Sequence, residues 1–99
     1  MEIRIQAVHF DASQQLEAFV QKKVSKLGKY LDNIQSAEIV LKLVKPESSQ
    51  NKEAGIKLIV PNQDFFASKT SDTFEESVDG AVEALEKQLI KFKEKQRTK

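Results

Sequence analysis

The chain has 99 residues, the size of one domain, and we expect a single domain over residues 1–99. It has no cysteine, which excludes disulfides and thiolate metal sites. No apolar run has the length of a signal peptide or approaches the roughly 20 residues that span a bilayer, so we expect a cytoplasmic protein.

The formal net charge is only +1, which taken alone argues against a nucleic-acid-binding protein. The charges are nevertheless unevenly distributed along the chain. Residues 20–30 and 87–99 together hold ten of the 16 basic side chains and one of the 15 acidic ones. A chain polarised in this way can attract a polyanion locally while its remainder stays acidic.

The first third of the chain predicts a strand and then a helix. Residues 2–8 alternate polar and apolar side chains, which is typical of a strand with one buried face. Asp11 and Ser13 offer N-cap oxygens for a helix that follows. Apolar residues then recur at helical spacing, and the pattern leaves open whether this helix ends at Gly28 or continues to Leu31.

Three further strands are predicted in the middle of the chain. Residues 36–44 and 54–60 each place apolar side chains on alternate positions. We expect a polar connection over residues 46–52, a short turn over 61–64 and a fourth strand over 65–70.

The last helix has the clearest pattern in the sequence. Thr73 and Glu76 have the spacing of a capping box, and apolar residues follow at helical spacing over five turns. We expect this helix over residues 74–95, with residues 96–99 as a frayed tail.

The order β-α-β-β-β-α predicts an α+β fold. A helix between the first two strands makes them parallel, and the short later connections make the rest of a four-stranded mixed sheet antiparallel. Each helix has one apolar face, so both are expected to cover the same face of the sheet.

No group of residues has the pattern of a catalytic, cofactor or metal site. The only histidine, His9, has no neighbouring nucleophile, and the three glycines are too isolated to form a phosphate loop. The acidic residues of the last helix fit a solvated face that complements the helix dipole. We therefore expect a protein that is not an enzyme and carries no cofactor and no metal.

The basic residues of the two helices carry the functional signal. In the first helix Lys22, Lys26 and Lys29 form one stripe with Lys23 beside it. In the second helix Lys87, Lys91 and Lys95 form another, while Lys93 and Arg97 lie on a different side. Repeated like charges one turn apart destabilise a helix, so their recurrence favours a binding role. The stripes can merge into one surface for RNA phosphates.

Two alternatives stay open at this point. Tyr30 can stack on a base or pack at the helix end, and the second role is slightly favoured. The open face of the sheet has an apolar centre of Val40, Ile59 and Phe66, which allows a different function, that of a protein-interaction adaptor.

Three segments carry a resemblance to a known family: Lys23-x-x-Lys26-Leu27-x-x-Tyr30, Leu85-Glu86-Lys87-Gln88-Leu89-x-Lys91-x-Lys93 and Ile39-Val40-Leu41-Lys42. Over nearly its whole length the chain resembles the ribosome hibernation-promoting factors and ribosome-associated inhibitors, also called sigma modulation proteins. It departs from them where Thr73-Phe74-Glu75 stands in place of a frequent Asp-Met-Tyr. Lys87 stands where many members have arginine, which keeps the charge but loses bidentate geometry.

The resemblance implies a fold like that of double-stranded-RNA-binding domains and a partner, the small ribosomal subunit. Family members bind its rRNA in the channel used by mRNA and tRNA, inhibit translation in resting cells, and need no membrane and no small-molecule substrate. The basic residues that match the family motifs are Lys23, Lys26, Lys87, Lys91 and Lys93; Lys22, Lys29 and Lys95 join them by helical geometry. Long members carry a C-terminal dimerisation domain, which we do not expect here.

Overall fold

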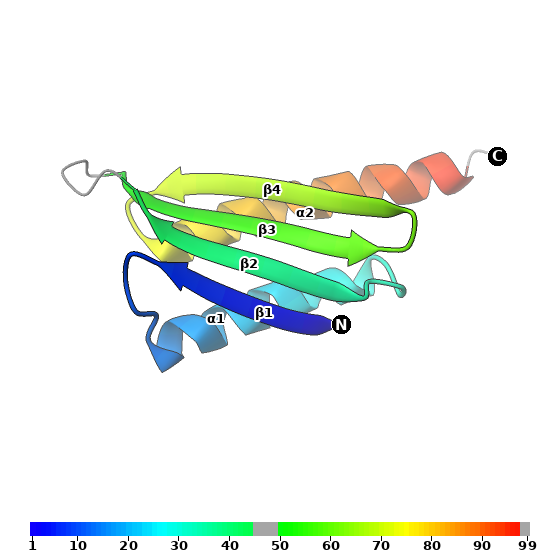
Figure 1. Cartoon of the computed structure of the whole chain (residues 1–99). Helices are drawn as coiled ribbons and strands as arrows, with labels where there is room; N and C mark the ends of the chain where they lie inside the picture. Colours follow the sequence, from blue (N-terminus) through cyan, green and yellow to red (C-terminus); the bar gives the residue numbers. More distant parts are fainter. Residues whose placement is uncertain (45–49, 98–99) are drawn as a thin grey trace.

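The computed structural model describes residues 1–44 and 50–97 (Figure 1). Its elements follow the predicted order: β1 (Glu2–Val8), α1 (Gln14–Ser25), a 3-10 turn η1 (Lys26–Lys29), β2 (Ser36–Leu43), β3 (Lys52–Val60), β4 (Gln63–Ser71) and α2 (Phe74–Arg97). The expected α+β class with two helices and four strands is confirmed.

The four strands form one sheet in the order β1-β2-β3-β4. The pair β1 and β2 is parallel, and the other two pairs are antiparallel, as the connections predict. Both helices cover the same face of the sheet (Figure 1). Strands β1 and β4 point in the same direction, and each is followed by a helix that runs back along the sheet. The two helices are therefore parallel, and their C-termini point toward the same end of the molecule.

Both α-helices begin at the predicted hydroxyl caps. The Ser13 hydroxyl accepts a hydrogen bond from the Leu16 amide at 3.1 Å, and the Thr73 hydroxyl accepts one from the Glu76 amide at 3.1 Å. The capping box of α2 is formed on one side only, since the Glu76 carboxylate faces the Thr73 hydroxyl at 3.5 Å.

The core lies between the sheet and the helix layer. Fully buried side chains of the strands, such as Ile39, Ile56 and Leu58, pack against Val24 and Leu85 of the helices. Two aromatic pairs close the ends of this layer: Phe10 stacks on Phe74 with ring centroids 4.5 Å apart, and Phe65 meets Phe92 edge-on at 5.3 Å. The core therefore fixes the rotation of each helix about its axis.

The bounds of two elements near the loops differ from the prediction. The sequence left open whether the first helix ends at Gly28 or continues to Leu31; α1 ends before both, at Ser25, and the chain tightens into the 3-10 turn η1. Strand β3 begins at Lys52, inside the predicted connection over 46–52, because Lys52 pairs with Leu43 of β2. The remainder of that connection includes residues 45–49, which lie outside the described residues.

Strand β4 and helix α2 are also longer than predicted. The hairpin turn consists of Pro61 and Asn62 alone, and Asn62 takes the positive φ of 70° that this turn needs after proline. Strand β4 therefore starts earlier than residue 65. Helix α2 extends to Arg97, two residues beyond the predicted end at residue 95, and residues 98–99 lie outside the described part.

Candidate nucleic-acid interface

Two polar contacts hold α1 and α2 side by side. The Lys23 ammonium lies 2.9 Å from the Asp79 carboxylate, and the Tyr30 hydroxyl donates a hydrogen bond to Glu86 at 3.0 Å. Each pair joins residues 56 positions apart, so the parallel helices keep one register along their contact. This register fixes where the basic residues of one helix lie relative to those of the other.

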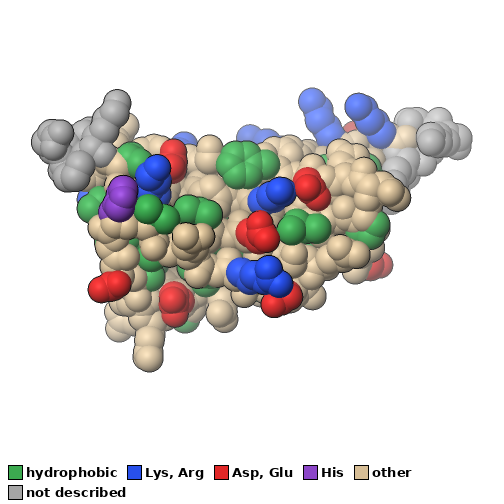
Figure 2. All heavy atoms as spheres, viewed as in Figure 1, with side chains coloured by type: hydrophobic (Ala, Val, Ile, Leu, Met, Phe, Trp, Pro, Cys, Tyr) green, Lys and Arg blue, Asp and Glu red, His purple; other side chains and the backbone are tan. Residues whose placement is uncertain are grey.

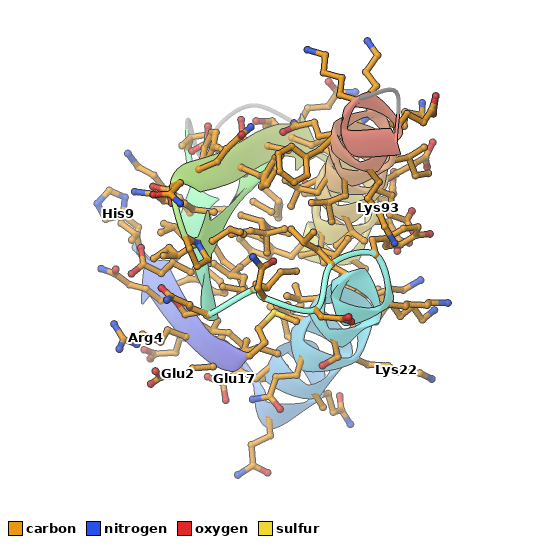
Figure 3. The ribbon with its side chains drawn as sticks, turned by 90° about the vertical axis from the view of Figure 1, so that its right-hand side faces the viewer. Glu2, Arg4, His9, Glu17, Lys22 and Lys93 are labelled. Atoms are coloured by element: carbon orange, nitrogen blue, oxygen red, sulfur yellow. The ribbon has the colours of Figure 1, made fainter. Side chains whose placement is uncertain are left out.

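Three lysines of the first helical segment point away from the sheet. Lys22, Lys26 and Lys29 are exposed. Each follows a fully buried residue, Val20, Val24 or Leu27, by two positions. Two positions correspond to about 200° around a helix, which places these lysines opposite the core. Figure 3 shows Lys22 on the outer side of the helix layer.

Lys93 of α2 belongs to the same side of the molecule. It follows Glu86 by two full turns and therefore shares the flank of α2 whose Glu86 reaches Tyr30. In the register of the helices, Lys93 lies about 12 Å further along the axis than Lys29. Figure 3 shows Lys93 and Lys22 on the outer side of the helices. We call Lys22, Lys26, Lys29 and Lys93 the α1-side surface.

Two of the other predicted lysines of α2, Lys91 and Lys95, turn away from this surface, whereas Lys87 stays on the outer face of the helix. Steps of four residues rotate by about 40° around a helix, so the stripe winds from the outer face at Lys87 toward β4 at Lys95. Gln88 marks the flank that faces β4, because its amide donates a hydrogen bond to the Phe66 carbonyl at 3.0 Å. Lys91 and Lys95 follow Gln88 by three and seven positions and share that side. Beyond Lys87 the stripe therefore diverges from that of the first helix, whereas the sequence predicted that the two stripes can merge.

Three carboxylates of α2 that face α1 or the outer side have partners within the protein. Asp79 pairs with Lys23, Glu86 accepts from Tyr30, and Glu83 lies 3.8 Å from Lys87. Within the described residues, no ion pair reaches Lys22, Lys26, Lys29 or Lys93. The α1-side surface thus keeps its positive charge beside an acidic helix.

The side chains of Lys23 and Tyr30 contact other parts of the protein and are only partly exposed. Lys23 is 29% exposed and also lies over the Phe19 ring, 5.6 Å from its centroid. Tyr30 is half-buried against the core, which favours its packing role. The hydrogen bond to Glu86, together with burial, raises the pKa of the Tyr30 hydroxyl.

The open face of the sheet has interspersed charges of both signs, as Figure 2 shows. Arg4 lies near Glu38, and Lys57 pairs with Asp64 at 3.7 Å. Phe66, 58% exposed, has its ring over Gly55, since a Cβ added at Gly55 would lie 3.5 Å from it. The exposed ring therefore covers bare backbone of its own sheet.

One basic residue beside α2 lies on a strand, so the helical pattern of the sequence does not identify it. Lys69 belongs to β4, and its aliphatic stem crosses α2 at Gly80, where an added Cβ would overlap its Cδ atom. Nothing in the local pattern of β4 distinguishes Lys69 from any exposed strand lysine. The missing Cβ at Gly80 is the one sequence signal for this close approach.

Other site types find no support in the described residues. No group of three or more histidine, aspartate or glutamate side chains in the described residues is placed to hold a metal ion. None of the described helices is long and apolar enough to cross a membrane.

Comparison with known proteins identifies relatives of the whole chain. Residues 3–97 match the model of a family described as sigma 54 modulation protein / S30EA ribosomal protein. The chain is 26% identical over 98 residues to a ribosome hibernation promoting factor of Pseudomonas putida, covering 99% of this chain and 92% of that protein. The corresponding protein of Azotobacter vinelandii is 29% identical over 96 residues, with coverages of 97% and 86%.

A solved structure confirms the architecture. A ribosomal subunit interface protein from Coxiella burnetii superimposes with a TM-score of 0.83 at 26% identity. The superposition covers 94% of this chain and 98% of that one.

Proposed function

Because the chain belongs to the sigma 54 modulation protein / S30EA ribosomal protein family, we propose that it is a ribosome hibernation factor. It binds rRNA of the small ribosomal subunit in the channel that mRNA and tRNA use, and it thereby inhibits translation in resting cells. The relatives named ribosome hibernation promoting factor support the cellular role. The lysines of the helix layer support the mode of binding.

The observation that carries the proposal is the unneutralised α1-side surface. Its four lysines cover about 22 Å along the helix pair, a length that follows from their register and the helical rise. Phosphates are the ligand that such a row fits, because RNA presents a regular series of negative charges along its backbone. Of the neighbouring carboxylates of α2, Asp79 pairs with Lys23 and Glu83 with Lys87, and within the described residues no carboxylate forms an ion pair with the four lysines.

The mechanism is steric and involves no chemical step. Phosphate contacts position a protein on RNA but carry no base sequence information directly. Specificity therefore comes from the shape of the channel into which the helix layer fits. A domain bound there excludes mRNA and tRNA from the same space.

Lys23 takes a positioning role in this proposal. Its ammonium pairs with Asp79 and its side chain lies over Phe19, so it holds α1 against α2. Lys87, which pairs with Glu83, contributes less net charge than the four lysines of the α1-side surface.

The test is co-sedimentation of the purified chain with small ribosomal subunits over a range of salt concentrations. Each lost phosphate contact flattens the slope of log K against log salt concentration by about 0.7 to 0.9. The triple variant Lys22→Gln, Lys26→Gln, Lys29→Gln should flatten the slope by about 2 to 3 and weaken binding about 100-fold at 0.1 M salt. An unchanged slope would remove the electrostatic mechanism.

Three control variants separate this function from the alternatives. Lys57→Gln removes a lysine of the open sheet face and should leave the slope unchanged. Lys23→Gln should lower the melting temperature with little change in slope. Phe66→Ser tests the adaptor hypothesis: if it abolishes ribosome association while the triple lysine variant does not, the sheet face is the functional surface.

A further inference from the structure

The open face of the sheet lies away from both helices, and the proposed function does not use it (Figure 1). Outward side chains alternate with buried ones along each strand, and the strand register aligns the outward ones in rows across the sheet. One row runs from β1 to β4 and consists of Arg4, Glu38, Lys57 and Phe66. A cation thus stands at one end of this row, an aromatic ring at the other, and two opposite charges between them.

The charges of this face do not suit RNA. Its basic residues are Arg4, Lys42 and Lys57, and its acidic residues are Glu2, Glu38, Glu53 and Asp64. Three positive and four negative charges give the face a net charge of −1, which does not attract a polyanion. Val40 and Phe66 are its exposed apolar residues. An apolar centre among charges of both signs is typical of a contact between proteins.

The row of Arg4, Glu38, Lys57 and Phe66 is complementary to itself. A twofold axis parallel to the strands, placed between β2 and β3, brings two copies face to face with each row opposite the same row in reverse order. Glu38 of each copy then lies opposite Lys57 of the other, and Arg4 lies opposite the Phe66 ring, as in a cation–π contact. Because the contact is isologous, each pair occurs twice.

The next two rows fit the same axis. Val40 of each copy lies opposite Gly55 of the other. The Phe66 ring covers Gly55, so Val40 packs on that ring, and two such pairs of apolar side chains fill the centre of the contact. In the row beyond, Lys42 lies opposite Glu53. The central charges and the apolar centre therefore both find their partners in a second copy.

A twofold axis perpendicular to the strands fits less well. An axis along the Val40 row also opposes unlike charges, such as Glu38 and Lys42. It separates Arg4 from the Phe66 ring, however, and places both opposite uncharged residues of β1 and β4. The parallel axis is therefore favoured.

We propose that the open face of the sheet is a self-association surface, on which a second copy of the chain docks about a twofold axis parallel to β2 and β3. Charge complementarity identifies the occupant, because the face itself supplies a partner for each of its central charges. The helix layers of both copies point outward, so the α1-side surfaces stay accessible. The inference goes beyond the proposed function and does not depend on it.

The size of the face fits a weak, reversible dimer. Four strands about 4.8 Å apart and about 25 Å long present roughly 500 Å² per copy, near the lower end for specific interfaces. At the outer corners Glu2 lies opposite Asp64, an unfavourable pair that water screens. The expected dissociation constant is on the order of 100 µM.

The test is sedimentation equilibrium of the purified chain, without RNA, over concentrations of about 10 µM to 1 mM. Glu38→Lys places a lysine opposite each Lys57, and Lys57→Glu places a glutamate opposite each Glu38. Each variant alone should weaken the dimer about 10-fold or more. A mixture of the two variants restores opposite charges in both pairs and should form a mixed dimer of similar affinity to the unaltered one, which a misfolded variant could not do.

Two further variants serve as controls. Glu75→Lys makes the same change of charge as Glu38→Lys but lies on α2, away from the sheet face, and should leave the dissociation constant unchanged. Phe66→Ser removes the ring from the centre of the contact and should weaken the dimer about 10-fold.

The outcomes decide the proposal independently of RNA binding. A chain that stays monomeric throughout this range overturns it, and so does a dimer that neither charge reversal weakens. Recovery when Glu38→Lys is mixed with Lys42→Glu, but not with Lys57→Glu, would replace the parallel axis by the perpendicular one. If the chain is monomeric while Phe66→Ser impairs ribosome association, the face binds another protein and not a second copy. None of these results changes the salt slope of ribosome binding, which tests the proposed function separately.

Discussion

At the scale of single residues, the partners of a side chain decide its role more than its type does. Lys23 and Tyr30 belong to a segment that resembles an RNA-binding motif, yet both contact carboxylates of α2. Lys22 and Lys26 belong to the same helical segment, but their side chains face solvent. The difference is one of direction around the helix, about 100° per residue.

Replacing Tyr30 by phenylalanine should make stability depend less on alkaline pH. The hydrogen bond to Glu86 raises the pKa of Tyr30 above its unfolded value near 10. Its contribution is therefore fully present below about pH 10 and is lost as the pH rises through the higher folded-state pKa. Urea denaturation should show Tyr30→Phe less stable than the unaltered chain at pH 8, with the difference shrinking by pH 11. Lysine titration affects both proteins alike, so a constant difference would contradict this assignment.

At the scale of elements, α2 is the longest unit and organises the rest. Its 24 residues span about 36 Å, longer than the roughly 30 Å of the nine-residue strand beside it. Its buried residues cover β3 and β4, and its C-terminal turns continue beyond the sheet (Figure 1). The start of this helix is defined by Thr73 and its end by no comparable cap that the structure describes.

The variant Thr73→Ala should lower the free energy of unfolding by about 1 kcal/mol, because it removes the acceptor for the Glu76 amide. Urea denaturation at neutral pH measures the effect. Thr70→Ala, which removes an exposed hydroxyl from β4, is the matched control and should stay within about 0.5 kcal/mol of the unaltered chain. Equal effects for the two variants would show that the cap does not stabilise α2.

At the scale of the whole molecule, the parallel helices separate charge along the molecule. Acidic residues such as Glu17, Glu75 and Glu76 occupy the first turns, and lysines occupy the last turns. Both arrangements complement the helix dipoles. The C-termini of both helices point toward the same end of the molecule (Figure 1). The lysines in the last turns of the two helices therefore make that end of the protein basic.

A chain that ends at Phe92 should fold but bind RNA more weakly. Among the side chains of α2 that the structure describes, Leu89 is the last that is fully buried, so we expect removal of residues 93–99 to cost less than about 1 kcal/mol of unfolding free energy. The same truncation removes four basic residues, Lys93, Lys95, Arg97 and Lys99, and should flatten the salt slope by about 1.4 or more if at least two of them contact phosphates. Sedimentation and urea denaturation on the same preparation measure both quantities. A full-length variant with Lys93, Lys95, Arg97 and Lys99 all replaced by glutamine should reproduce the change in slope, and its failure to do so would assign the effect to lost structure.

The sequence alone determined the elements, their order and the sheet topology. These follow from local periodicity: Ser13 and Thr73 mark helix starts, alternation marks the strands, and short connections force antiparallel pairing. It also located the concentration of positive charge in residues 20–30 and 87–99, since charge is a property of composition. The resemblance to a family could be read from the same residues.

Only the tertiary structure decided which basic residues share a surface. Packing of the core set the rotation of α2, and the contacts Lys23–Asp79 and Tyr30–Glu86 accompany its register against α1. Those two quantities decide that Lys93 shares the flank that contacts α1 and Lys91 the flank that contacts β4, place Asp79 and Glu86 against residues of the first helical segment, and bring Lys69 across Gly80. They depend on contacts between residues far apart in the chain, whereas periodicity describes only neighbours one turn away.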